Sequence, residues 1–166
     1  RTLIDDMYAT QAAAHGVGLA APQIGVGLRI FTWSMANDDG VPSLGHVINP
    51  YVKAIKPAVG EPDREHESEG CLSVPGYSFP LRRGERAEVT GYDRDGNEIA
   101  FTATGWFARC MQHEYDHLNG FLYVDRLGDK WKKKARKAIK AEGWGVPGNT
   151  WLPGEGPDPF GHDDEE

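Results

Sequence analysis

The stretch QHEYDHLNG, residues 112–120, places two histidines four positions apart with a glutamate directly after the first. Residues four apart lie on one face of an α-helix, so the two histidines can act together only if this stretch is helical. His113 and His117 could then bind one metal ion, and Glu114, offset by one residue, could take a proton from a metal-bound water. The motif therefore predicts a metal-dependent hydrolase organised around a central helix.

Two histidines do not complete such a centre, because a catalytic metal usually takes three protein ligands and keeps one position open. The metzincin pattern would supply a third histidine at position 123, where this chain has Tyr123. Glu142 and His162 lie further downstream, in a basic helix and an acidic tail, and neither is favoured. Cys71, in the upstream stretch EGCLSVPG, is preferred, because a thiolate is a strong ligand for zinc and ferrous iron. Cys110 is expected to be an inert buried residue.

Apolar residues recur at helical spacing in some segments and at strand-like spacing in others. The expected helices cover residues 2–16, 105–118 and 131–143. The expected strands cover residues 28–34 and 46–52, the second interrupted by Pro50, and a hairpin is expected over residues 87–103. We expect Thr104 to be the N-cap of the second helix, and Gly16 and Gly120 to end the first and second helices. The order lacks the strand–helix–strand alternation of a parallel sheet. The prediction is an α+β fold with mostly antiparallel sheets packed around the central HExxH helix, and with a C-terminal helix.

The length of 166 residues suits one compact catalytic domain over residues 1–145, followed by an extended tail over residues 146–166 that is rich in glycine, proline and acid. The first residues lack the apolar core of a signal peptide, and no apolar run is long enough to span a bilayer. The net charge of −7 argues against nucleic-acid binding by the whole surface, although residues 129–140 are strongly basic. We therefore expect a cytoplasmic protein that contacts no membrane and recognises no specific nucleic-acid sequence.

Three motifs occur in a fixed order along the chain: GVGLAAPQ at residues 16–23, EGCLS at residues 69–73 and QHEYDH at residues 112–117. Together they resemble the peptide deformylase family, whose pattern is GxGxAAxQ, then EGCLS, then QHExDH. The resemblance covers most of the chain, and the long C-terminal tail is similar to that of one bacterial subgroup. A strand precedes the first helix in that family and is absent here, so we expect the chain to be truncated at its N-terminus.

The resemblance implies an enzyme of protein biosynthesis that removes the formyl group from the N-terminal formyl-methionine of newly synthesised proteins and releases formate. It assigns Cys71, His113 and His117 to the metal, and Glu114 to proton transfer, first as general base and then as the acid for the leaving amine. It implies one divalent ion, with Fe²⁺ as the native metal and Zn²⁺, Ni²⁺ or Co²⁺ as alternatives.

The resemblance also implies groups that contact the substrate. Gln23, through its side-chain amide, and Leu72, through its backbone N–H, would donate to the oxyanion of the tetrahedral intermediate. The substrate would pair its main chain with the strand at Val17 and Gly18, which gives affinity with little sequence preference.

Further residues are placed around the methionine side chain and behind the metal ligands. Val17, Trp106 and Cys110 are the expected lining of an apolar pocket. Independently of the resemblance, the apolar residues Trp106, Cys110 and Met111 precede or adjoin the histidines on the helix and indicate that this face points inward. Three charged residues, Glu69, Arg83 and Asp116, occupy positions that in the family contact one another and orient the histidines.

Two other interpretations remain. An HExxH metallopeptidase of another family is disfavoured, because Tyr123 stands at the metzincin position and EGCLS would be unexplained. A ribosome- or RNA-binding module could use the basic helix at residues 130–140. Such a run is more commonly a solvated helix face, but the terminal helix of the family can dock at the nascent-chain exit of the ribosome. The expected partners are N-formylmethionyl nascent peptides and, through residues 130–140, the ribosome.

Overall fold

A computed structural model describes residues 2–55, 59–156 and 158–160 of the chain. Its contacts gather into two compact units, each made of two chain segments. Unit 1 comprises Arg1–Gly60 and Arg83–Phe121, and unit 2 comprises Glu61–Arg82 and Leu122–Glu166. The chain therefore passes between the units at three points. The predicted division into a catalytic domain of residues 1–145 and a tail of residues 146–166 stays a prediction.

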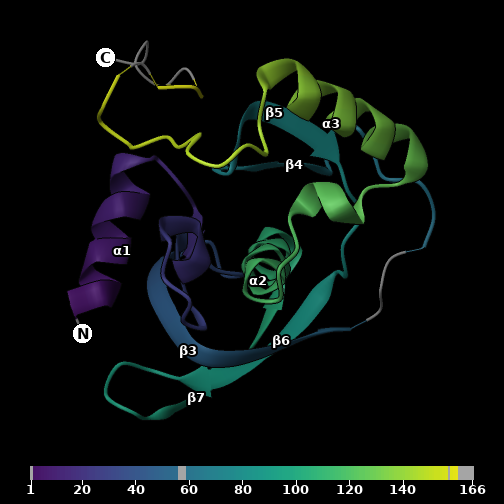
Figure 1. The fold of residues 1–166 in the computed structure, drawn as a ribbon. Coiled ribbons are helices and arrows are strands. Elements are labelled where there is room, and N and C mark those ends of the chain that lie inside the picture. The colour runs from purple at the N-terminus through teal and green to yellow at the C-terminus, as the bar shows by residue number, and fades with distance from the viewer. Residues whose placement is uncertain (1, 56–58, 157, 161–166) are drawn as a thin grey trace. The chain divides into compact units, whose positions relative to one another are not determined.

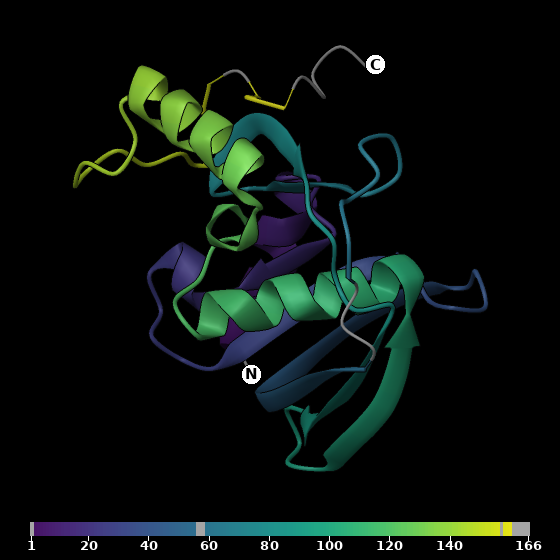
Figure 2. The same cartoon turned by 90° about the vertical axis from the view of Figure 1, so that its right-hand side faces the viewer.

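Unit 1 is built on a five-stranded antiparallel sheet in the order β1-β2-β3-β6-β7. Its strands are β1 (Gly18–Ala20), β2 (Ile30–Ala36), β3 (Pro42–Ile55), β6 (Arg86–Tyr92) and β7 (Glu98–Thr104). The sheet curves around helix α2 (Gly105–Leu118), which contacts all five strands (Figures 1 and 2). The predicted antiparallel α+β arrangement around the HExxH helix is confirmed.

Helix α1 (Thr2–Ala13) also packs against β1 and β2, so both α1 and α2 contact β2. Phe31 and Trp33 belong to the apolar core that α2 completes. Thr32 lies between these two residues in the sequence and is fully buried. It shares a hydrogen bond of 2.8 Å with the side-chain amide of Gln11 on α1. Successive strand residues point to opposite faces, so this unbroken run of buried residues reflects contact with both helices.

The bounds of α2 agree with the prediction, and Thr104 is its N-cap. Asp38 also holds this end, because both of its carboxylate oxygens lie 3.0 Å from the backbone nitrogen of Thr104. The helix is followed by Gly120, whose φ of 82° is the left-handed conformation that glycine adopts without steric cost.

Two local features differ from the sequence prediction. Pro50 does not interrupt the second strand: β3 continues through it with a bulge between Ile48 and Tyr51, where a residue without an N–H is tolerated. The left-handed residue after α1 is His15, with φ of 52°, rather than Gly16. Gly16 still takes part in ending the helix, because its N–H donates to the carbonyl of residue 11 at 2.9 Å.

Unit 2 contains the antiparallel strand pair β4 (Ser68–Cys71) and β5 (Val74–Pro80), the 3₁₀ turn η2 (Tyr123–Arg126) and helix α3 (Asp129–Glu142). The periodicity of the sequence does not predict β4 and β5. Helix α3, the predicted C-terminal helix, contacts β5 and η2. It buries Trp131 and Ala135 in the apolar core of the unit, and most of its basic side chains are exposed on the remaining surface.

The tail beyond α3 forms turns rather than regular structure in its described residues. The rings of Trp151 and Phe160 pack 5.6 Å apart, and a Cβ atom at Gly76 of β5 would lie 3.2 Å from the carbonyl oxygen of Pro159. His162 lies outside the described residues. Across the described part of the chain, every helix is too short or too polar to cross a bilayer.

His46 on β3 joins three parts of unit 1 through its two ring nitrogens. Nδ1 lies 2.7 Å from the hydroxyl oxygen of Tyr8 on α1, and Nε2 accepts the N–H of Arg94 in the β6–β7 turn at 2.9 Å. Arg94 also forms an ion pair of 2.8 Å with Asp5 on α1. Because Nε2 is an acceptor, this arrangement needs the neutral imidazole. Burial, and then the positive charge of Arg94, lower the pKa of His46.

A His46→Gln substitution should flatten the pH dependence of stability. A lowered folded-state pKa means that the unfolded chain binds the proton more readily, so this contribution is present above about pH 6.5 and is lost as the pH falls. We expect the free energy of unfolding, measured in urea, to fall less between about pH 7 and about pH 5 in the variant than in the wild type. His15→Gln, at an exposed position, is the control. Equal pH dependence in the wild type and His46→Gln would contradict the assignment.

Candidate metal centre

Helix α2 presents His113 and His117 one turn apart, and both side chains are buried. Their Nε2 atoms lie 3.2 Å apart. Two nitrogens that each bind a tetrahedral ion at about 2.1 Å are separated by about 3.4 Å. The observed separation therefore fits two ligands of a single metal ion.

Glu114 lies beside this pair and is only 3% exposed. Its Oε1 atom is 4.0 Å from Nε2 of His113. The carboxylate packs directly on β1: a Cβ atom placed on Gly18 would lie 2.5 Å from Oε1 and 2.9 Å from the carboxyl carbon. The absence of a side chain at Gly18 is therefore what lets Glu114 occupy its position next to the histidines.

The first sequence motif forms β1 and the 3₁₀ turn η1 (Ala21–Ile24). The N–H of Ala20 donates to Oε1 of Gln23 at 2.9 Å, which fixes the orientation of the side-chain amide. β1 is an edge strand, since it pairs with β2 and stands first in the sheet order. Val17, just before it, is 57% exposed.

The two predicted pocket residues on α2 differ in burial. Cys110 is buried as predicted, with its Sγ 3.9 Å from the carbonyl oxygen of Val17. Trp106 is 54% exposed, so the prediction that this face points inward is wrong at Trp106. Trp106 lies in the first turn of the helix, and its ring packs under the guanidinium of Arg109 at 5.0 Å. Whether these residues line a methionine pocket stays a prediction.

A buried ion pair supports the second half of α2. Nη1 of Arg83 lies 2.6 Å from Oδ2 of Asp116, and the two side chains are 7% and 10% exposed. Asp116 directly precedes His117. Two members of the predicted charged network are thus in contact, while Glu69, the third, lies buried on β4 in unit 2.

Unit 2 carries the candidate third ligand. Cys71 ends β4, is buried and forms no disulfide. Its sulfur accepts the N–H of Ser73 at 3.4 Å across the turn to β5, and Leu72 is half-buried in that turn. Each of Cys71, His113 and His117 offers one ligand atom from a buried position, so these are the residues that could hold a metal.

Tyr123, at the position of the metzincin histidine, and the disfavoured ligand Glu142 both have other contacts. Tyr123 in η2 is 1% exposed, and its hydroxyl donates to the carbonyl oxygen of Tyr77 at 3.4 Å. Burial raises the pKa of Tyr123 well above its ordinary value, and nearby negative charges raise it further. Glu142, near the end of α3, accepts a hydrogen bond of 2.8 Å from the hydroxyl of Tyr77.

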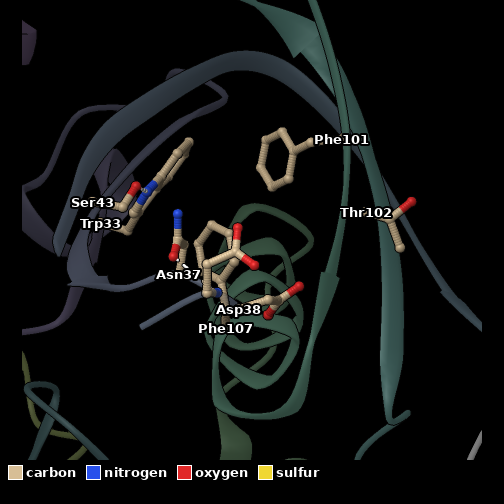
Figure 3. A pocket seen from close by; sticks show the side chains of 8 residues that line it. Trp33, Asn37, Asp38, Ser43, Phe101, Thr102 and Phe107 are labelled. Atoms are coloured by element: carbon tan, nitrogen blue, oxygen red, sulfur yellow. Dashed lines mark hydrogen bonds between the residues drawn. The ribbon is translucent and has the colours of Figure 1, made fainter. Parts of the chain in front are cut away.

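A cavity of about 310 Å³ lies elsewhere in unit 1 (Figure 3). The rings of Trp33, Phe101 and Phe107 line it, with centroids 5.6 to 5.9 Å apart, and Asp38 lies on its polar side. Its lining includes none of the described residues that the sequence assigned to the site. Because Asp38 is already bound to the start of α2, we regard the cavity as part of how that helix end packs on the sheet.

The chain matches the model of the polypeptide deformylase family over residues 1–133. A peptide deformylase of Mycolicibacterium paratuberculosis is 54% identical over 162 residues, which are 96% of this chain and 82% of that protein. A peptide deformylase of Mycobacterium marinum is 52% identical over 162 residues, which are again 96% of this chain and 82% of that protein.

Solved structures give the same result. The crystal structure of a peptide deformylase from Ehrlichia chaffeensis matches with a TM-score of 0.71 and 34% identity, covering 87% of this chain and 83% of that one. The structure of Arabidopsis thaliana peptide deformylase 1B in complex with an inhibitor matches with a TM-score of 0.74 and 29% identity. The match covers 90% of this chain and 83% of that one.

Arg83→Met should be far more costly than the same change at the neighbouring arginine. It removes the buried positive partner of the Asp116 carboxylate, and we expect a loss of about 3–5 kcal/mol in unfolding free energy. Arg82→Met is the matched control, because the Arg82–Glu67 pair is 2.9 Å long but its side chains are 31% and 22% exposed. We expect that control to cost less than about 1 kcal/mol. Urea denaturation measures both, and equal costs would contradict this account.

Proposed function

This chain belongs to the peptide deformylase family, and on that basis we propose how its own residues remove the formyl group from the N-terminal formyl-methionine of newly synthesised proteins. The observation that carries the proposal is the convergence of two buried imidazoles at 3.2 Å beside a buried carboxylate on the same helix. That arrangement supplies two metal ligands and a proton acceptor in one rigid element.

We propose that Cys71, His113 and His117 together hold one divalent ion. One thiolate and two imidazoles suit both zinc and ferrous iron, and three protein ligands leave one position open. We propose Fe²⁺ as the native metal, with Zn²⁺, Ni²⁺ or Co²⁺ able to replace it. When bound, such an ion lowers the pKa of a coordinated water and polarises the formyl carbonyl.

Glu114 is the proposed proton carrier. It accepts the proton of the attacking water and passes it to the amine that leaves when the bond to the formyl carbon breaks. Its burial and its contact with Gly18 keep the carboxylate close to the histidine pair, which supports this role. A carboxylate held in one place loses little entropy when the proton is transferred.

The proposed donors to the oxyanion are the side-chain amide of Gln23 and the backbone N–H of Leu72. The hydrogen bond from Ala20 engages the carbonyl oxygen of the Gln23 amide, so the NH₂ group is the end of this side chain that can donate to a substrate oxygen. Loss of one such donor typically costs about 3 kcal/mol in transition-state stabilisation.

Substrate binding is proposed at the edge strand β1. The main chain at Val17 and Gly18 would pair with the peptide, and the exposure of Val17 and the place of β1 in the sheet support this. Val17, Trp106 and Cys110 are the proposed contacts of the methionine side chain. Glu69, with the Arg83–Asp116 pair, is proposed to orient the metal ligands.

Formate release from a formyl-Met peptide, measured with enzyme prepared without oxygen, tests the mechanism. Glu114→Ala should retain the metal and lose nearly all activity, because the proton acceptor is gone. Cys71→Ser should bind metal more weakly. Activity that survives in Glu114→Ala would exclude the proposed role of Glu114. Cleavage of an internal peptide bond instead of deformylation would favour the alternative, an HExxH metallopeptidase of another family.

Gly18→Ala is the companion variant in the same assay. The added methyl group cannot share space with Oε1 of Glu114, so the carboxylate must move although its chemistry is unchanged. We expect a large fall in kcat with the metal retained. Gly27→Ala is the control, because a Cβ atom there meets no atom within 4 Å.

A ribosome contact through α3 and a cytoplasmic location complete the proposal. The apolar side of α3 is buried in unit 2, and its exposed side chains include Lys130, Lys133, Lys134, Arg136, Lys137 and Lys140. A dense positive surface suits the phosphate-rich ribosome, where the formylated nascent chains emerge.

Charge reversal on α3 should weaken ribosome binding. We expect Lys133→Glu combined with Lys137→Glu to lower the affinity by about tenfold or more at about 0.1 M salt, measured by co-sedimentation. Lys53→Glu combined with Arg86→Glu makes the same change in net charge at exposed positions of unit 1. Equal losses in both pairs, or unchanged binding after deletion of residues 129–166, would contradict a contact through α3.

A further inference from the structure

Gln112, the first residue of the QHEYDH motif, holds Gly84 by two reciprocal hydrogen bonds. The N–H of Gly84 donates to Oε1 of Gln112 at 3.0 Å, and Nε2 of Gln112 donates to the carbonyl oxygen of Gly84 at 2.8 Å. Nε2 also donates to the carbonyl oxygen of Ala108, one turn earlier on α2, at 3.0 Å. The side-chain amide thus satisfies the main chain of Gly84 as a neighbouring strand would, and it is itself fixed to the helix.

The position of Gly84 shows that this contact is close on both sides. A Cβ atom there would lie 2.9 Å from the Cβ of Ala54 on β3 and 3.3 Å from Oε1 of Gln112. Gly84 is buried. The segment at Gly84 is therefore held between β3 and α2, with the amide of Gln112 as its polar attachment.

This segment lies where the chain re-enters unit 1. Arg83 is the first residue of the second segment of that unit. Its guanidinium pairs with Asp116, which lies one turn after Gln112 on α2. The backbone carbonyl of Asp116 also accepts the N–H of Phe121 at 2.9 Å, and Phe121 is the last residue before the chain enters unit 2 again. Residues 112 and 116 of one helix face thus hold the chain at two of its three crossing points.

We propose that Gln112 is a positioning residue for the metal centre. By fixing Gly84 on α2, it fixes the adjacent Arg83 against Asp116, and Asp116 directly precedes the ligand His117. The inference rests on the proposed function, because it assigns Gln112 a role in holding residues that the proposal makes metal ligands.

The physical reason lies in how accurately ligands must be placed. Groups behind a metal ligand set its orientation, and their loss typically lowers metal affinity or activity by about 10- to 100-fold. A long arginine side chain can hold Asp116 in one geometry only if its own backbone is fixed. The clamp supplies that fixed point, since two bonds to one residue restrict both its position and its rotation.

The test compares Gln112→Met with Gln11→Met in the metal-loaded enzyme. Methionine keeps the length of the side chain and removes all three hydrogen bonds. Gln11 is the matched control, because it is a buried glutamine of unit 1 that bonds Thr32 away from the centre. We expect Gln112→Met to lower kcat for formate release by about 10- to 100-fold while KM changes less than about threefold. Gln11→Met should leave both constants near the wild-type values, even if it lowers stability as much.

Two further measurements separate positioning from general stability. Hydrogen exchange at the Gly84 amide should accelerate by at least about tenfold in Gln112→Met, and Co²⁺ affinity, measured by chelator competition, should fall. In the double variant Gln112→Met/Arg83→Met, kcat should fall no further than in Arg83→Met alone, because both residues act through Asp116. Additive losses in the double variant, or wild-type kcat and Co²⁺ affinity in a folded Gln112→Met, would overturn the proposal.

Gln112→Glu keeps the test informative if Gln112→Met does not fold. It retains an acceptor for the Gly84 N–H and should give a kcat between those of Gln112→Met and the wild type. Wild-type enzyme that releases no formate would refute the proposed function, whereas amide exchange and Co²⁺ affinity would still decide whether Gln112 positions the centre. Gln112→Glu loses only the bonds that Nε2 donates to the carbonyl oxygens of Gly84 and Ala108, so unchanged Co²⁺ affinity in a folded Gln112→Glu would refute the clamp as a positioning device.

Discussion

The burial of charged and polar side chains on α2 is the constraint on which unit 1 depends. The helix places Phe107, Ala108 and Met111 in the apolar core, and a few residues later it buries His113, Glu114, Asp116 and His117. Each buried charge costs several kcal/mol unless a partner compensates it. The surroundings of α2 reflect that requirement, because Arg83 pairs with Asp116 and the two imidazoles converge on a point suited to a cation. Gly18 on β1 makes room for Glu114.

The division into two units gives the proposed centre a second property. The histidines and the carboxylate belong to unit 1, and Cys71, the third proposed ligand, belongs to unit 2. A ligand that binds only the folded chain stabilises it in proportion to the logarithm of its concentration over its dissociation constant. Within unit 1, the part of the proposed centre on α2 depends on how firmly Arg83 is held against Asp116, which is where the Gln112–Gly84 contact acts.

The elements that the sequence predicts well are those that depend on interactions between residues close together in the chain. The bounds of α2 could be predicted because they depend on local signals: histidine spacing, an N-cap at Thr104 and a glycine at position 120. The β6–β7 hairpin was also local, with its turn at Gly96. The strands β4 and β5 are short and lie next to turns, so their pattern is weak until they pair. Trp106 was predicted to be buried from its apolar character, but the first turn of α2 leaves it exposed.

For the candidate site, the types of residue and the order of the motifs identified more residues than hydrophobic periodicity did. The spacing of His113 and His117 specified a metal pair, but the third ligand came from the chemistry of Cys71 and from the order of three motifs. The contact between Gly18 and Glu114 could not be read from the sequence, since it joins an edge strand to a helix 96 positions away. The lack of a side chain at Gly18 therefore has two consequences. The bare backbone of β1 makes room for the carboxylate, and the same backbone is the proposed edge for the peptide. The proposed proton acceptor and the proposed site of the substrate main chain therefore both depend on the position of this short strand.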